Sequence, residues 1–146
     1  MLFAESRILA HKLKILLVED NPFQLQATLC LLETYGFTQI TTADSADSAL
    51  QKMQAAIQPF EILLCDQCLP DLPGLELIGI AHYQGYIRHA ILLSSLTTDE
   101  LGALKASAHA QYLPLLGYLA KPLKHSELLR LLTPLQNDNP NQPISP

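Results

Sequence analysis

The sequence has little positive charge and no cluster of it. Nine Lys and Arg residues stand against 14 Asp and Glu, which gives a net charge of −5, and the basic residues are scattered along the chain. A protein that binds nucleic acid directly neutralises phosphates with a positive face. We therefore expect no direct contact with nucleic acid.

Long apolar runs and a secretory leader are missing as well. No apolar segment reaches the roughly 20 residues of a membrane-spanning helix, and residues 1–7 lack the basic-then-apolar pattern of a signal peptide. The three cysteines, Cys30, Cys65 and Cys68, are an odd number in a chain of this kind. These absences favour a cytoplasmic protein with free thiols and no membrane contact.

Common enzyme signatures are absent too. The sequence contains no P-loop, dinucleotide fingerprint, nucleophile elbow or metalloprotease helix. Cys65 and Cys68 have CxxC spacing, but a zinc site needs two more paired ligands. A redox pair would stand at a helix start, not across a predicted strand end. We interpret Cys65 as a core residue.

What is present is a repeated alternation of apolar runs and amphipathic helices. The chain has 146 residues, 49% of them hydrophobic and 16% charged, which suits one compact domain. A helix is expected after each run, including one after Asp44 or Ser45 with an apolar stripe that extends to Ile57, and one opened by a Thr97 to Glu100 capping box. The predicted strands are 14–18, 37–43, 60–66, 89–93 and 116–120. Five such units predict an α/β fold with a doubly wound parallel sheet.

The two ends of the chain differ in composition from this alternation. Residues 1–12 carry no strong signal and are interpreted as an N-terminal extension. The domain itself is predicted to cover residues 13–135. Residues 136–146 are polar and rich in proline, which is typical of a tail or linker.

Polar side chains stand at the ends of four of the five predicted strands. Glu19 and Asp20 follow the first, Asp66 ends the third, Ser94 the fourth and Lys121 the fifth. Parallel strands place their carboxyl ends at one edge of the sheet, where open α/β sheets bind ligands. We therefore expect these side chains to form one site, whereas Asp71 is expected only to decorate the turn after Asp66.

Three carboxylates at one point repel one another unless a proton or a cation joins them. Oxygen donors without histidine favour Mg²⁺ or Mn²⁺. Beside such an ion, Lys121 could neutralise a phosphoryl group, Ser94 could hydrogen-bond it and Asp66 could be its in-line nucleophile.

These motifs together resemble the receiver domain of bacterial two-component response regulators, over about residues 13–135. The resemblance rests on Ile-Leu-Leu-Val-Glu-Asp-Asn at 15–21, Asp-Gln-Cys-Leu-Pro-Asp-Leu-Pro-Gly at 66–74, and Gly-Tyr-Leu-Ala-Lys-Pro at 117–122. It implies a flavodoxin-like, CheY-like (βα)5 fold with strand order 2-1-3-4-5. It also implies that Asp66 accepts phosphate from a histidine kinase or a histidine phosphotransfer protein.

The resemblance further implies a role for each matching residue. Asp20 would bind Mg²⁺ directly, Glu19 through water, and Asp66 and the main-chain carbonyl of Cys68 would complete the metal site. Ser94 and Lys121 would hold the phosphoryl group. Ser94 and Tyr118 would form the switch that reshapes the face of the fourth helix, fifth strand and fifth helix.

The resulting hypothesis is a signalling domain that catalyses only its own phosphorylation and dephosphorylation. A downstream output domain or protein and a homodimer are possible partners. Three alternatives stay open. One is a receiver-like adaptor that does not use phosphate. A second is the N-terminal regulatory domain of a cyclic-di-GMP phosphodiesterase of the EAL type, because the segment from Ser94 to Lys121 is longer than usual. A third is an Asp-nucleophile phosphatase, although Cys68 stands where such enzymes usually carry a second acid.

Overall fold

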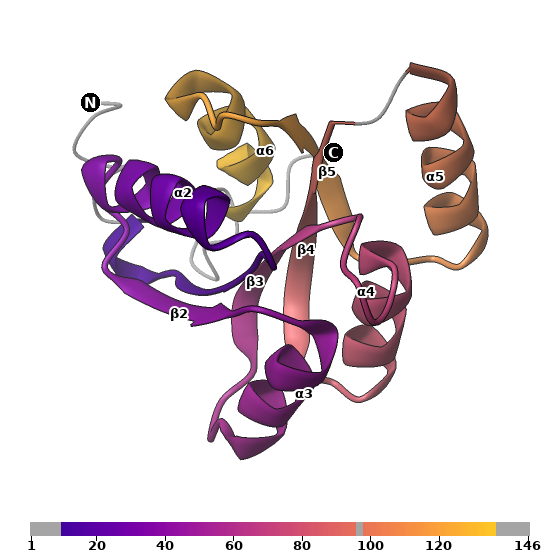
Figure 1. Cartoon of the computed structure of the whole chain (residues 1–146), viewed down its shortest axis with the longest axis horizontal. Coiled ribbons are helices and arrows are strands. Elements are labelled where there is room, and N and C mark those ends of the chain that lie inside the picture. Colours follow the sequence, from indigo (N-terminus) through magenta and orange to yellow (C-terminus); the bar gives the residue numbers. More distant parts are fainter. Residues whose placement is uncertain (1–9, 96–97, 137–146) are drawn as a thin grey trace, which may run out of the picture.

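The computed structural model describes residues 10–95 and 98–136. Their centre is a parallel five-stranded sheet with the order β2-β1-β3-β4-β5 (Figure 1). The strands are β1 (Lys14–Val18), β2 (Gln39–Ala43), β3 (Phe60–Asp66), β4 (Ile87–Ser94) and β5 (Leu115–Ala120). The predicted doubly wound fold and its strand order are confirmed, with β2 at one edge of the sheet.

The sheet divides the apolar residues into two cores, one on each face. Along β1, Ile15 and Leu17 join one core, while Leu16 and Val18 join the other. All four are buried, as expected of a strand covered on both sides. This burial on both faces explains the continuous apolar runs in the sequence.

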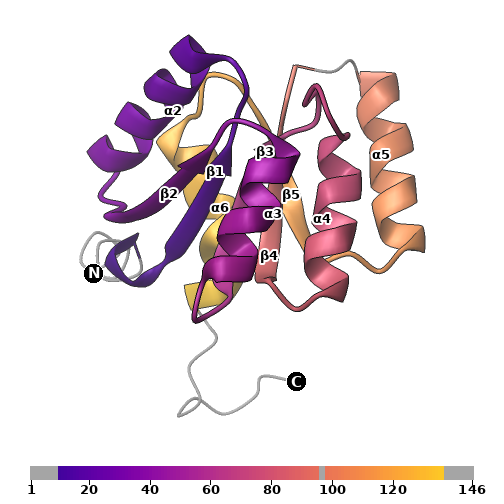
Figure 2. The ribbon, with the colours of Figure 1, turned by 60° about the horizontal axis from the view of Figure 1, so that its bottom comes forward.

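Helices cover both faces of the sheet. α2 (Pro22–Thr34) and α6 (His125–Gln136) pack on one face, and α3 (Ala46–Ala55), α4 (Gly74–Tyr83) and α5 (Thr98–Ala110) lie on the other. Figure 2 shows α3, α4 and α5 in front of the sheet and α6 behind it. No helix among the described residues combines the length and apolarity needed to cross a bilayer.

Local sequence sets where α2 begins and ends. The side chain of Asn21 accepts hydrogen bonds from the backbone N–H groups of Phe23 and Gln24, and Pro22 occupies the first helical position. Gly36 follows the helix with φ of +99°, a conformation that favours glycine. The loop that carries Glu19 and Asp20 is therefore held by a capped helix start.

Several predicted boundaries were wrong by a few residues. α3 ends at Ala55 because Ala56 adopts an extended conformation, and Ile57, expected on the inward stripe, is 97% exposed. β2 begins at Gln39 rather than Phe37, but Phe37 is buried in the core before it. The predicted cap Thr97 lies outside the described residues.

α5 packs loosely on the sheet. Ala108 is buried, but Leu101 and Leu104 are only half-buried, and Figure 2 shows α5 beside α4 at the outer end of this helix layer. A cavity of about 740 Å³ lies between α5 and β5, with Lys105, Tyr118 and Leu131 of α6 among its lining residues. The side of the domain formed by α5, β5 and α6 is therefore less filled than the rest.

The last residues of the predicted N-terminal extension lie against the domain. Residues 10–12 form a helical turn, and Ala10 is buried in the core beside Gly36. The Nε2 group of Gln39 donates to the carbonyl oxygen of His11 at 2.7 Å. This part of the extension thus contributes to packing on the α2 side of the sheet.

Candidate functional site

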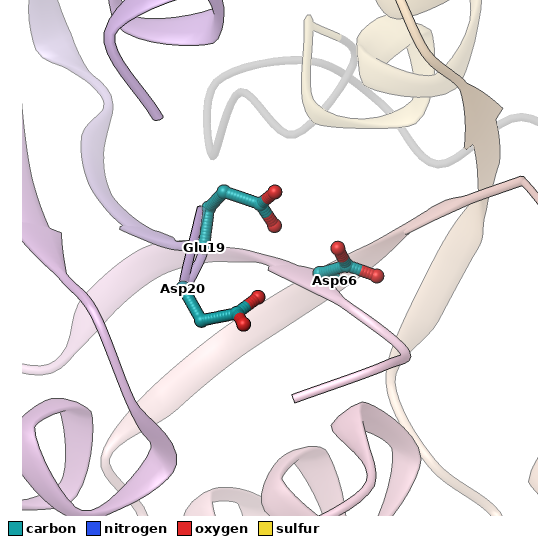
Figure 3. Close-up of side chains that lie close together, drawn as sticks. All are labelled: Glu19, Asp20 and Asp66. Carbon is teal, nitrogen blue, oxygen red and sulfur yellow. The ribbon is translucent and has the colours of Figure 1, made fainter. Parts of the chain in front are cut away.

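Three carboxylates meet at the carboxyl edge of the sheet. Glu19 and Asp20 follow β1, and Asp66 is the last residue of the adjacent strand β3. Oxygen atoms of the three side chains lie within 4.8 Å of one another, and Figure 3 shows the carboxyl groups gathered at one point. The structure therefore brings together the acids that the sequence analysis selected.

Asp66 is buried and held through both carboxylate oxygens. Its Oδ1 accepts a hydrogen bond from the backbone N–H of Cys68 at 2.9 Å, and its Oδ2 lies 2.5 Å from Lys121 Nζ. Burial by itself raises the pKa of Asp66, but hydrogen bonds with Glu19, Lys121 and the Cys68 N–H outweigh it and lower the pKa below its ordinary value. This carboxylate is thus kept ionised.

The pKa of Glu19 shifts in the opposite direction to that of Asp66. Only 2% of it is exposed, and its burial, followed by the hydrogen bond and charge of Asp66, raises its pKa from 4.5 to about 7. Lys121 opposes this shift without cancelling it. Because the cluster holds more negative charge than one lysine neutralises, it favours a further proton or a cation.

Lys121 connects the site to β5, at the far side of the sheet from β1. Its ammonium group lies 3.2 Å from Glu19 Oε1 and donates to Gln24 Oε1 at 2.7 Å, in addition to its contact with Asp66. Burial lowers the pKa of Lys121, but Asp66 and Glu19 more than compensate, so that it is raised overall and the group stays charged. Gln24 was missed by the sequence analysis; its place in the first turn after the acid pair was the available signal.

These side chains surround an open cavity of about 530 Å³. The sequence analysis expected the hydroxyl group of Ser94 at this site. Ser94 is the buried last residue of β4, and it is the next residue, Ser95, that lines the cavity. Cys68 also lines it. The lining includes Glu19, Asp20, Gln24, Asp66, Cys68, Ser95 and Lys121.

The loop after Asp66 is braced against the start of α4. The backbone N–H of Gly74 donates to the carbonyl oxygen of Gln67 at 2.9 Å, and the N–H of Leu75 donates to Gln67 Oε1 at 2.9 Å. A Cβ atom on Gly74 would lie 2.4 Å from the carbonyl oxygen of Asp66. Glycine is therefore needed at position 74 because the helix start touches the backbone of Asp66.

Asp71 was predicted to have no role beyond its own turn, and this prediction is wrong, because its side chain binds a different element. Both of its carboxylate oxygens accept hydrogen bonds from backbone N–H groups at the start of α3. Those bonds, from Asp47 first and then Ala46, lower the pKa of Asp71.

Tyr118 lies on β5 and lines the cavity between α5 and β5. Its hydroxyl is buried and has no hydrogen-bond partner among the described residues, and Lys105 Nζ lies 5.5 Å from the ring centroid. Burial raises the pKa of the phenol. The residue is therefore held inward by packing rather than by a polar contact of its hydroxyl.

The cysteines are free, as predicted. Cys65 is buried in the core while Cys30 and Cys68 are exposed. Burial raises the pKa of the Cys65 thiol far above its ordinary value, so it is an inert packing residue.

The donor set fits a hard divalent cation. Three carboxylate oxygens within 4.8 Å of one another are the ligand type that Mg²⁺ prefers. Lys121 Nζ lies beside two of the three carboxylates. The three acids could hold such a cation, and the ammonium group of Lys121 beside them could bind an anionic group.

Comparison with known proteins gives a consistent result. Residues 15–133 match the response regulator receiver domain family. The chain is 27% identical over 134 residues to the transcriptional regulatory protein BasR of Escherichia coli K12, covering 89% of this chain and 55% of BasR. It is 40% identical over 65 residues to the sensor protein TorS of the same organism, covering 44% of this chain and 7% of TorS.

Solved structures agree. A CheY-like response regulator receiver domain protein from Methanospirillum hungatei JF-1 superimposes with a TM-score of 0.66 at 27% identity, covering 87% of this chain and 96% of the other. CheY4 of Vibrio cholerae gives 0.65 at 25% identity, covering 86% and 99%. The chain thus spans nearly all of these isolated domains, but only about half or less of the curated relatives.

Proposed function

Because this chain belongs to the response regulator receiver domain family of two-component signalling, we propose that it receives a phosphoryl group on Asp66. The observation that carries the proposal is the contact of Lys121 Nζ with Asp66 Oδ2 at 2.5 Å, in a cavity also lined by Glu19 and Asp20. An ionised carboxylate, a fixed ammonium group and an acid pair on one cavity wall are what phosphoryl transfer to a carboxylate requires.

The chain's own residues supply the nucleophile and much of the charge compensation. The hydrogen bonds that lower the pKa of Asp66 keep it ionised. An oxygen of Asp66 attacks the phosphorus of a phosphohistidine, a P–O bond forms, and the P–N bond breaks with its electron pair left on the imidazole. Lys121, which remains charged beside Asp66, stabilises the negative charge on the equatorial oxygens.

Mg²⁺ is the proposed cofactor, with Mn²⁺ as a substitute. Glu19, Asp20, Asp66 and the main-chain carbonyl of Cys68 would hold it. When bound, such an ion neutralises charge on the carboxylates and on the phosphoryl oxygens. The raised pKa of Glu19 supports a cation at this place, because it reflects negative charge that Lys121 alone does not balance.

The switch is proposed to run from the site to the face formed by α5, β5 and α6. Ser94 is buried at the end of β4, one residue before the cavity wall, and its hydroxyl would hydrogen-bond the phosphoryl group. Tyr118 would move with it. The cavity under α5 gives the ring and the helix room to change position.

The proposed partners are those of the family. A histidine kinase or phosphotransfer protein would supply the phosphoryl group, and a downstream protein, an output domain or a second copy would respond to it. We place the receiver unit at residues 13–135, with residues 1–12 and 136–146 flanking it, in the cytoplasm. The presence together of acid pair, phosphoacceptor and lysine favours this reading over an adaptor that ignores phosphate.

The test is phosphorylation by a small donor. Wild-type protein incubated with acetyl phosphate and Mg²⁺ should form an acyl phosphate that intact-mass spectrometry detects, and Asp66→Asn should form none. Asp99→Asn, which removes an exposed acid from the first turn of α5, is the matched control and should be labelled as wild type is.

Full labelling of Asp66→Asn would show the assignment to be wrong. Release of phosphate from generic phosphomonoesters at many turnovers would instead favour the phosphatase alternative. Beryllofluoride titration with Mg²⁺ separates the adaptor alternative, which predicts no response.

A further inference from the structure

We propose that Asp71 is a positioning residue for the metal side of the site, because it ties the loop after Asp66 to the first turn of α3. The inference rests on the proposed function, since it concerns how the chain holds the Mg²⁺ ligands. It assigns a role to a residue that contacts neither the metal ligands' carboxylates nor the lysine.

The contact is bidentate. Asp71 Oδ1 accepts from the backbone N–H of Ala46 at 3.0 Å, and Oδ2 accepts from the N–H of Asp47 at 2.9 Å. These are two of the N–H groups at a helix start that have no partner within the helix. The next one, of Ser48, is taken by Ser45 Oγ at 3.0 Å. Thus α3 is capped twice, once from its own N-cap residue and once from a loop 25 residues away.

The loop that Asp71 anchors is the one that carries Cys68. At its beginning, the backbone N–H of Gln67 donates to the carbonyl oxygen of Leu93 at 3.2 Å, and at its end Gly74 closes back on Gln67. Leu69 is buried beneath it. Asp71 adds a charged link from the outer part of the loop to another element, and both of its hydrogen bonds have ordinary N–H···O lengths.

α3 is in turn fixed to the strand end that carries the acid pair. The backbone N–H of Glu19 donates to the carbonyl oxygen of Ala43 at 3.1 Å, and Ala43 is the last residue of β2, three before the start of α3. Asp71 therefore closes a frame that runs from Asp66 through its loop, across α3 and β2, to Glu19. The ends of β1 and β3 are already paired directly, with Val18 beside Cys65, so what this frame adds is a hold on the Cys68 loop relative to the acid pair.

Mg²⁺ demands near-ideal octahedral geometry, so a site for it is sensitive to the separation of its ligands. Loss of the tether should let the Cys68 loop drift relative to the acid pair. Asp71→Ala should raise the Mg²⁺ concentration for half-maximal beryllofluoride binding by about 3- to 10-fold. That is below the roughly 10- to 100-fold typical of residues that hydrogen-bond a metal ligand directly. Binding at saturating Mg²⁺ should be close to wild type, because the ligands themselves remain.

Ser45→Ala is the matched control. It removes the other cap of the same helix end, with a comparable hydrogen bond, but does not touch the loop. Both variants should lower the unfolding temperature of the metal-free protein. Only Asp71→Ala should shift the Mg²⁺ midpoint, and only Asp71→Ala should speed amide hydrogen exchange of residues 67–73 without metal. Asp71→Asn keeps one acceptor oxygen, so its Mg²⁺ midpoint should lie between those of the wild type and Asp71→Ala. It replaces Asp71→Ala in the test if the alanine variant does not fold.

Equal Mg²⁺ midpoints for Asp71→Ala and Ser45→Ala, with a normal response of the wild type, would overturn this inference and leave the proposed function standing. If the wild type itself shows no Mg²⁺-dependent response, the proposed function fails, and the role of Asp71 in metal binding fails with it. The behaviour of the wild type therefore separates the two failures.

Discussion

Gly74→Ala should damage the site and the stability together. Gly74 is the buried first residue of α4, and a Cβ there would lie 2.4 Å from the carbonyl oxygen of Asp66, 2.9 Å from Gln67 Cα and 3.0 Å from the carbonyl carbon of Asp66. All three neighbours are backbone atoms, which cannot rotate away as a side chain could. Relief therefore requires the helix start and the Asp66 backbone to separate by roughly 1 Å, enough to restore ordinary packing distances.

The change in the free energy of unfolding combines two contributions of opposite sign, helix propensity and overpacking. Alanine is favoured over glycine within a helix by up to about 1 kcal/mol. Overpacking of a tight site costs about 1–3 kcal/mol, occasionally more. Because the contacts are with backbone, we take the upper end of that range and expect a net loss of about 2 kcal/mol. For a chain of this size that corresponds to a fall of roughly 4–8 °C in Tm.

The assay is thermal unfolding of the metal-free protein by far-ultraviolet circular dichroism, since the chain has no tryptophan for fluorescence. Acyl-phosphate formation at saturating Mg²⁺ is measured in parallel and should fall, because Asp66 is displaced. Gly102→Ala is the control: Gly102 lies within α5, and a Cβ there would meet nothing within 4 Å. That variant should gain about 0.5–1 kcal/mol from helix propensity. If Gly74→Ala were as stable and as readily labelled as Gly102→Ala, the argument from steric contact would be refuted.

Two further predictions concern titration and an unpaired hydroxyl. Burial, together with Asp66, raises the pKa of Glu19 from 4.5 to about 7. Between these two pH values the folded protein binds a proton that the unfolded chain has released. The free energy of unfolding therefore decreases as the pH rises through this range. Urea unfolding without metal should therefore show a smaller loss of stability between pH ~5 and ~8 in Glu19→Gln than in wild type, and equal losses would contradict it. The hydroxyl of Tyr118 is buried without a partner among the described residues, and an unmet buried polar group costs about 1–3 kcal/mol. Tyr118→Phe should raise Tm, and a lower Tm would mean that the hydroxyl is satisfied in solution.

The sequence by itself determined the architecture and most of the site. The strands β1, β3 and β4 are visible as largely apolar runs because each is covered on both faces, whereas the edge strand β2 is less apolar and less buried. The acids, the serine pair and Lys121 could be assigned to one edge because parallel strands share the orientation of their ends. Both inferences use information carried by residues that are neighbours in the chain.

Only the tertiary structure decided which of these residues touch and what else joins them. Gln24 reaches Lys121 from α2, Ser95 rather than Ser94 lines the cavity, and Asp71 caps a helix from a different loop. The early end of α3 and the loose packing of α5 were equally beyond local pattern. The physical reason is that a helix end or a lysine takes whichever acceptor lies nearest in space, and the packing of distant segments settles that distance.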